Sequence, residues 1–320
     1  MKNFITKVIF SIAIFIAVLP FYEKYDFIFE ILQHKKLGGI GMDLMYYKVS
    51  KIKNEDIIYF GDSVIRSHSK TDSIKKSIVE IINDSLNIDI HDLSNFGSSP
   101  IIFNEYIKYL LRNNIYPKLI IVPLNLRIFS PLDENIDLRW RISLINELRG
   151  CPIPFDVYNF NSKNLKLDYS ESVETPSNGN LSLEKWDRIK ISNLKKSYIE
   201  KYFQTIDNDN KNFQSYVEMT ELLIKNKIDF IYYFTPINGN VSTVLENDFF
   251  LKRIAQNKQK IKSVLENEFN KNFIDLSLAI ESSLFTSKGE PDEHLNFLGR
   301  KLVADKVVHK ILQKHYKYNQ

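Results

Sequence analysis

The feature that most restricts how this chain can fold is the alternation, from about residue 50 onward, of short apolar runs with segments of helical periodicity. Five runs have the length and residue types of β-strands, at residues 56–60, 88–93, 118–124, 228–234 and 273–276. Apolar residues recur at helical spacing in the segments between and after them, at 72–86, 100–111, 211–226, 245–267 and 297–314. Strands and helices in steady alternation predict an α/β domain, with helices flanking a doubly wound parallel sheet.

Local signals agree with this pattern. The run at 118–124 is almost wholly apolar, which is typical of a parallel strand buried on both faces. Pro100 fits the first position of a helix, where its missing N–H costs nothing, and Ser99 precedes it. Thr71 or Asp72 is the expected N-cap of the helix over 72–86.

Two stretches depart from the alternation. Residues 26–54 look helical and connect the N-terminal segment to the first strand. Residues 130–210 are rich in Asn, Ser and charge, with little periodicity before about residue 185, and are too long for a simple connection. We therefore expect a domain over 55–320 that contains an inserted segment or lid at about 130–210.

The N-terminus has the character of an export signal. Lys2 and Lys7 precede an apolar run that extends to Tyr22, and the stretch of ~20 residues is long enough for a helix to cross a bilayer. Because the positive charges lie before the run, the N-terminus should stay in the cytoplasm. No small-residue cleavage pattern follows the run, so residues 1–25 are expected to form an uncleaved signal anchor, with a cleaved signal as the alternative. Either way, the rest of the chain would work outside the cytoplasmic membrane.

Composition excludes several other classes. The net charge of +4 is spread along the chain without a basic block, so nucleic acid is not an expected partner. Cys151 is the single cysteine, which excludes an intramolecular disulfide framework and a Cys-rich zinc site. No phosphate-cradling glycine loop or dinucleotide fingerprint is present, and no metal or cofactor is predicted.

A possible nucleophile and base lie far apart in the sequence. Ser63 follows the first strand in Gly61-Asp62-Ser63, and ligands of parallel sheets bind beyond the carboxyl ends of the strands. Alone, this tripeptide reads equally well as a turn glycine followed by helix-capping residues. His294 lies in an acidic loop before the last predicted helix, where a general base with a carboxylate partner would be expected.

Two further residues end neighbouring strands. Gly97 follows the second strand and Asn125 the third. A glycine lets backbone approach a substrate closely, and an asparagine amide can donate to a developing oxyanion. Their shared position beside the expected serine is what favours a catalytic role over a turn glycine and a capping asparagine.

The ordered set Ser63, Gly97, Asn125 and His294 resembles the SGNH (GDSL-type) hydrolase superfamily over about residues 55–315, the insertion excluded. The resemblance implies Ser63 as nucleophile and His294 as base. It also implies an oxyanion hole made by the backbone amides of Ser63 and Gly97 with the Asn125 side chain. The superfamily usually has an aspartate three residues before the histidine, where this chain has Pro291. Asp292 is the expected acid, with Glu290 as the alternative.

A narrower resemblance concerns one branch of the superfamily. The N-terminal anchor, residues 95–99 and residues 233–238 are similar to membrane-tethered proteins of D-alanyl transfer to lipoteichoic acid and of alginate O-acetylation. This resemblance implies an extracytoplasmic serine esterase or O-acyltransferase acting on acyl groups, first of all acetyl, of a cell-surface glycan or other cell-envelope polymer. A membrane-bound O-acyltransferase is a possible partner. The alternative is a catalytically inactive accessory protein that binds such an acyltransferase or a polymer.

Overall fold

The computed structural model describes residues 45–46, 48–68, 72–130, 144–145, 148–150, 199–239, 248–265, 273–286 and 293–317. The expected signal anchor, most of the expected connector and most of the expected insertion lie outside these ranges, as do Asp292 and Glu290. None of the helices within the described ranges is both long and apolar enough to cross a membrane.

The described chain forms an α/β domain around one parallel sheet. Its five strands are β1 (Ile57–Gly61), β2 (Ile90–Ser94), β3 (Leu119–Leu124), β4 (Asp229–Phe234) and β5 (Phe273–Asp275). They lie in the order β2-β1-β3-β4-β5, and all the pairings are parallel. The predicted fold class is confirmed, and each strand lies within two residues of its expected bounds.

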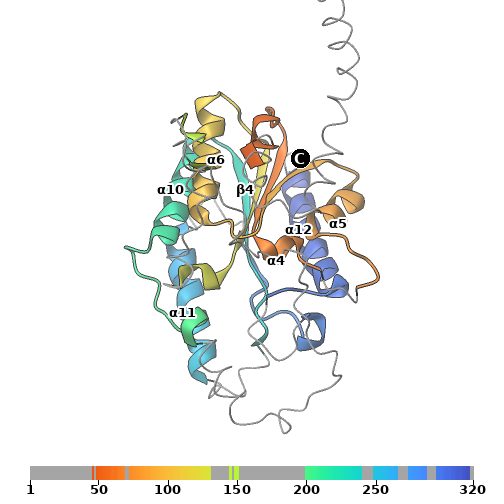
Figure 1. Ribbon diagram of the computed structural model, residues 1–320, viewed down its shortest axis with the longest axis vertical. Helices are drawn as coiled ribbons and strands as arrows, with labels where there is room; N and C mark the ends of the chain where they lie inside the picture. The colour runs from red at the N-terminus through yellow and green to blue at the C-terminus, as the bar shows by residue number, and fades with distance from the viewer. Residues whose placement is uncertain are drawn as a thin grey trace, which may run out of the picture.

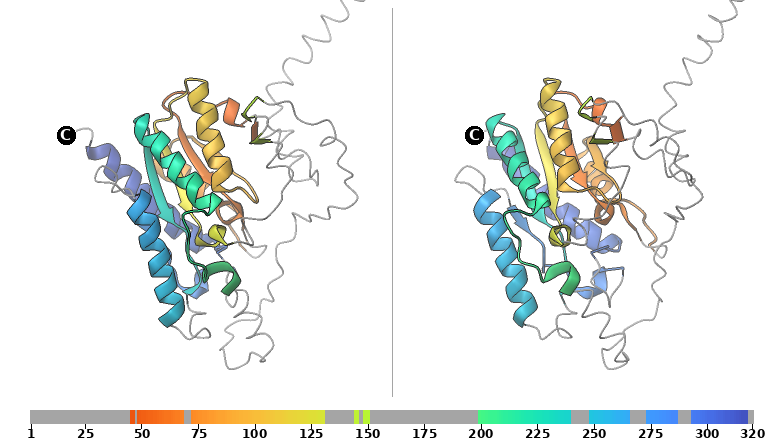
Figure 2. Two further views of the ribbon diagram at one scale, coloured as in Figure 1. Left: turned by 90° about the vertical axis from the view of Figure 1, so that its left-hand side faces the viewer. Right: turned by 60° about the vertical axis from the view of Figure 1, so that its left-hand side comes forward.

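Helices cover both faces of this sheet (Figure 1). One face carries α6 (Pro100–Arg112), α10 (Lys211–Lys225) and α11 (Asp248–Leu265), and the other carries α5 (Ile78–Leu86) and α12 (Phe297–Lys317). Figure 2 shows α6, α10 and α11 side by side along their face. The sheet is therefore the middle layer of three, as the near-continuous apolar runs of its strands indicate.

Alternating strand residues feed two separate cores. Ile58 and Phe60 of β1 belong to the larger core under α6 and α10, whereas Tyr59 between them belongs to the core under α5 and α12. This alternation follows from the pleat of a strand, which points successive side chains to opposite faces. All three side chains are fully buried, so the central strand is fixed from both sides.

One helix begins later than predicted. The sequence suggested a helix over 72–86 capped by Thr71 or Asp72, but α5 begins at Ile78 and is capped by Ser77. Ser77 Oγ accepts from the backbone N–H of Glu80, and the Glu80 carboxylate accepts from the N–H of Ser77. This reciprocal capping box fixes the start of the helix at Ile78. The side chain of Asp72 instead binds α12, as described below.

The order of the strands determines where a ligand would bind. The chain leaves β1 for the β2 edge and returns to β3 on the other side, so connections after β1 and β3 run in opposite directions. A crevice opens at such a switch point, beyond the carboxyl ends of the two strands. Ser63 follows β1 and Asn125 follows β3, so both predicted site residues lie at this position.

Candidate active site

The nucleophile turn, residues 61–64, joins β1 to the one-turn helix α4 (Ser63–Arg66). Asp62 is the N-cap, and its Oδ1 accepts from the N–H of Val64 at 2.9 Å. A Cβ at Gly61 would lie 2.5 Å from Ile65 Cγ1, so only glycine lets the strand pass this close to α4. The turn glycine and the capping Asp62 are therefore the features that place Ser63 at the start of α4.

His294 lies next to Ser63 in space. Its Nε2 is 3.4 Å from Ser63 Oγ, and both side chains are half-buried. This distance is longer than an ordinary hydrogen bond, as catalytic pairs often are before substrate binds. The structure thus brings together the predicted nucleophile and base from opposite ends of the domain.

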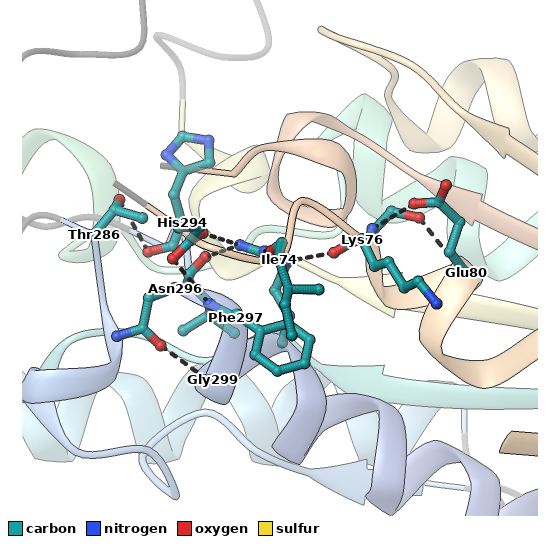
Figure 3. A network of polar contacts seen from close by, with 12 residues as sticks. Ile74, Lys76, Glu80, Thr286, His294, Asn296, Phe297 and Gly299 are labelled. Carbon is teal, nitrogen blue, oxygen red and sulfur yellow. Dashed lines mark hydrogen bonds and ion pairs between the residues drawn. The ribbon is translucent and has the colours of Figure 1, made fainter. Parts of the chain in front are cut away.

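Backbone contacts hold the base loop, residues 293–296, on one side. The carbonyl oxygen of His294 accepts from the N–H of Thr286 at 2.8 Å and from its hydroxyl at 3.2 Å, and Leu295 forms an antiparallel bridge with Phe285. Asn296 caps α12 by accepting from the N–H of Gly299 at 3.1 Å. Figure 3 shows that the imidazole of His294 points away from these contacts.

Arg300 holds the same loop from the other side. Its guanidinium is fully buried and donates to the carbonyl oxygen of Leu295 at 2.6 Å. It also donates to Asp72 Oδ2 at 2.9 Å and to the carbonyl oxygens of Ile74 and Lys76 at 3.0 and 2.9 Å. The loop that follows α4 is therefore bound to the helix that follows His294. We call this set, Arg300 with residues 72–76, the arginine anchor.

Gly97 lies in the turn that follows β2. Its φ of 70° is in the left-handed region that favours glycine. Ser94, three residues earlier, pairs with Gly61, and the N–H of Asn95 donates to the Gly61 carbonyl at 3.1 Å. The Gly97 turn therefore begins beside the nucleophile turn, as the resemblance to SGNH hydrolases implies for an oxyanion-hole glycine.

The side chain of Asn125 lies between two carboxylates. Its Nδ2 donates to Asp62 Oδ2 at 3.2 Å and to Glu293 Oε2 at 2.6 Å, while its Oδ1 accepts from the N–H of Arg127 at 3.0 Å. Both amide hydrogens thus have protein acceptors. Asn125 can bind an oxyanion only by exchanging one of these acceptors for it.

Glu293 is the site residue that the sequence analysis missed. Its side chain is fully buried, and Tyr202 Oη donates to Oε1 at 2.5 Å. Arg127 Nη1 lies 3.7 Å from Oε2. Burial raises the pKa of this carboxyl above its ordinary value, although Arg127 and Tyr202 oppose the shift. Three acidic residues precede His294 in close succession, and nothing in the sequence marks Glu293 among them as a buried residue.

His91, another of the histidines, is not at the site. Its Nε2 lies 2.8 Å from Asp56 Oδ2, and Asp56 precedes β1 at the opposite end of the sheet from Ser63. The expected acid Asp292 and its alternative Glu290 lie outside the described residues, so the identity of the acid stays a prediction.

Comparison with known proteins adds weak likenesses. No family model matches the chain, and no curated protein matches it. Among solved structures, a GDSL-like lipase from Bacteroides thetaiotaomicron has a TM-score of 0.41 and 9% identity, covering 84% of this chain and 98% of that one. A putative acylhydrolase from Bacteroides fragilis has a TM-score of 0.39 and 11% identity, covering 83% and 94%.

Proposed function

We propose that this chain is a serine esterase or O-acyltransferase of the SGNH type. The observation that supports this most is the 3.4 Å approach of His294 Nε2 to Ser63 Oγ, at the switch point of the sheet. A serine hydroxyl is a weak nucleophile until a base takes its proton, and this pair supplies both. Gly97 and Asn125 follow the neighbouring strands, where donors to an oxyanion are needed.

The chemistry proceeds in two acyl transfers. His294 takes the proton from Ser63 Oγ as that oxygen attacks the carbonyl carbon of an ester. The N–H groups of Ser63 and Gly97, with the Asn125 amide, stabilise the negative oxygen of the tetrahedral intermediate. The intermediate collapses, the leaving alcohol takes the proton from His294, and the acyl group remains on Ser63. A second hydroxyl then attacks the acyl-enzyme, with His294 again as the base, and restores Ser63.

The acceptor in the second step distinguishes the two activities. Water as acceptor makes an esterase, and a glycan hydroxyl makes an O-acyltransferase. We propose that the acyl group, acetyl in the first instance, belongs to a cell-surface glycan or other envelope polymer, with a membrane-bound O-acyltransferase as a possible partner. This part rests on the resemblance of the N-terminal segment and of residues 95–99 and 233–238 to polymer-modifying proteins.

A second candidate is an inactive accessory protein that binds such an acyltransferase or a polymer. The observation that favours it is the engagement of both Asn125 amide hydrogens by carboxylates. An oxyanion hole that never gains this donor would be weak. The two candidates differ in whether Ser63 reacts.

Fluorophosphonate labelling of residues 27–320 separates them. Serine hydrolases with an activated hydroxyl form a covalent adduct, so the proposed enzyme should be labelled on Ser63 and should hydrolyse p-nitrophenyl acetate. Ser63→Ala is the matched control. A folded protein that is neither labelled nor active would support the accessory role.

We also propose that residues 1–25 hold the domain at the outer face of the cytoplasmic membrane. The apolar run behind Lys2 and Lys7 supports this placement. The protein in its native host should fractionate with membranes, keep its first residues and be cut by protease added from outside. A mature N-terminus near residue 20, found by mass spectrometry, would show a cleaved signal instead.

A further inference from the structure

One amide group joins the two loops that carry the proposed catalytic pair. Asn125 Nδ2 donates to Asp62, the residue directly before Ser63, and to Glu293, the residue directly before His294. Nucleophile turn and base loop thus meet at a single nitrogen, although they lie at opposite ends of the domain sequence. The bridge is therefore one of the contacts between the base loop and the nucleophile turn.

Glu293 holds its half of the bridge rigidly. The side chain has 0% exposure, and both carboxylate oxygens have partners: Tyr202 Oη at Oε1, and Asn125 Nδ2 at Oε2. A buried carboxylate persists only where hydrogen bonds and charges replace water, so its position is closely specified. Its burial also means that it touches no substrate and acts through its neighbours.

The two bonds of the Asn125 amide differ in length. The bond to Glu293 is 2.6 Å and the bond to Asp62 is 3.2 Å. Charge-assisted bonds are stronger when short and well directed, so the bond to Asp62 is the easier one to exchange for an oxyanion. The Glu293 bond would then keep the amide in place during the exchange.

We propose that Glu293 is a positioning residue for the acyl transfer described above. Its carboxylate orients the Asn125 amide as an oxyanion donor and, through that amide, holds the base loop against the nucleophile turn. The inference rests on the proposed function for its kinetic effect, whereas its structural effect is independent of activity. A purely local packing role would leave the nucleophile turn unaffected by changes at Glu293.

Hydrogen–deuterium exchange tests the coupling without any activity. Glu293→Ala should raise exchange both in the base loop and in the nucleophile turn, because the bridge links them through Asn125. Glu105→Ala is the matched control, since Glu105 is also a buried carboxylate, but its partners, Arg149 and Lys108, lie on the α6 side of the sheet. Faster exchange confined to the base loop in Glu293→Ala would overturn the proposal.

The kinetic arm measures the rate of fluorophosphonate labelling. A displacement of about 1 Å at a reacting group can lower rates about 10²-fold, so Glu293→Ala should be labelled at least about ten times more slowly. Glu293→Gln should stay within about threefold of the parent, since its amide oxygen can accept from Asn125 and its NH₂ can donate to Tyr202. Labelling of Glu293→Ala at the parent rate, or equal loss in both variants, would contradict positioning.

Failure of the proposed function can be told apart from failure of the Glu293 proposal. If the parent protein is not labelled at all, the proposed function fails while the exchange experiment still decides the bridge. If Glu293→Ala does not fold, Tyr202→Phe removes one hydroxyl from the same carboxylate and should raise exchange in both loops by a smaller amount. Unchanged exchange in Tyr202→Phe together with a parent-like labelling rate would overturn the proposal.

Discussion

Nε2 of His294 lies 3.4 Å from Oγ of Ser63, although 231 positions separate the two residues in the sequence. The pair is assembled by the fold, since β1 presents Ser63 at the switch point and the start of α12 brings the base loop to the same edge. An arrangement held from two distant parts of the chain is sensitive both to the reacting groups and to the contacts that hold their loops.

Removing either member of the pair should abolish most turnover. General-base catalysis contributes about 10²–10⁴-fold, so His294→Ala should lower the hydrolysis of p-nitrophenyl acetate by that range. Ser63→Ala should lose at least as much, and the double variant should lose little more, because the two residues act as a unit. Parent-like turnover in Ser63→Ala would refute the nucleophile assignment.

Loss of the Asn125 amide should act mainly on kcat. Removal of one oxyanion donor lowers kcat about 10²–10³-fold. The kcat of Asn125→Ala should therefore fall by this factor, with little change in KM. Steady-state kinetics with an acetyl ester measure the two constants separately. A raised KM with an unchanged kcat would show that Asn125 binds the ground state instead.

Asp292→Asn and Glu290→Gln should differ sharply. If Asp292 orients the imidazole, its amide variant favours the wrong tautomer and loses turnover, as in other serine triads. Glu290→Gln should then remain near the parent rate. Turnover of both variants, with circular dichroism to verify folding, decides the acid, and full activity in both would leave a Ser–His dyad.

Arg300→Lys should destabilise the domain. A lysine cannot reach the acceptors of the arginine anchor together, and each buried carbonyl left without a partner costs about 1–3 kcal/mol. Urea unfolding should show this loss. Lys301→Ala is the control, because its pair with Asp305 is half exposed and contributes about 0–1 kcal/mol. Equal stability of the two variants would contradict the role of the anchor.

Glu293→Gln should change how stability depends on pH. Because burial raises the pKa of Glu293 in the fold, the unfolded chain ionises first as pH rises, and the parent loses stability from about pH 4.5 upward. The glutamine does not titrate. The difference in Tm, variant minus parent, should therefore grow more positive as pH rises above about 4.5. A difference in Tm that falls as pH rises would contradict the raised pKa.

The sequence predicted most of the sheet because its strands are short, apolar and separated by helical periods. The predicted helix was wrong over residues 72–77. The apolar spacing there continued the helical pattern, but this segment is a loop whose backbone carbonyls bind the buried Arg300. A tertiary contact overrode the local periodicity there. The capping box of Ser77 and Glu80 is a sequence signal that could have predicted the true start of the helix. The burial of Glu293 could not be predicted from the sequence, because it depends on distant partners, Asn125 after β3 and Tyr202.

The arginine anchor has a consequence for how this loop can diverge. Arg300 donates hydrogen bonds to the backbone carbonyls of Ile74 and Lys76, whereas at Asp72 it binds the side chain. The side chain of Ile74 is 39% exposed, so its identity is almost independent of the anchor. Substitutions at positions 74 and 76 can therefore change the surface of the loop that follows α4 while the base loop keeps its position.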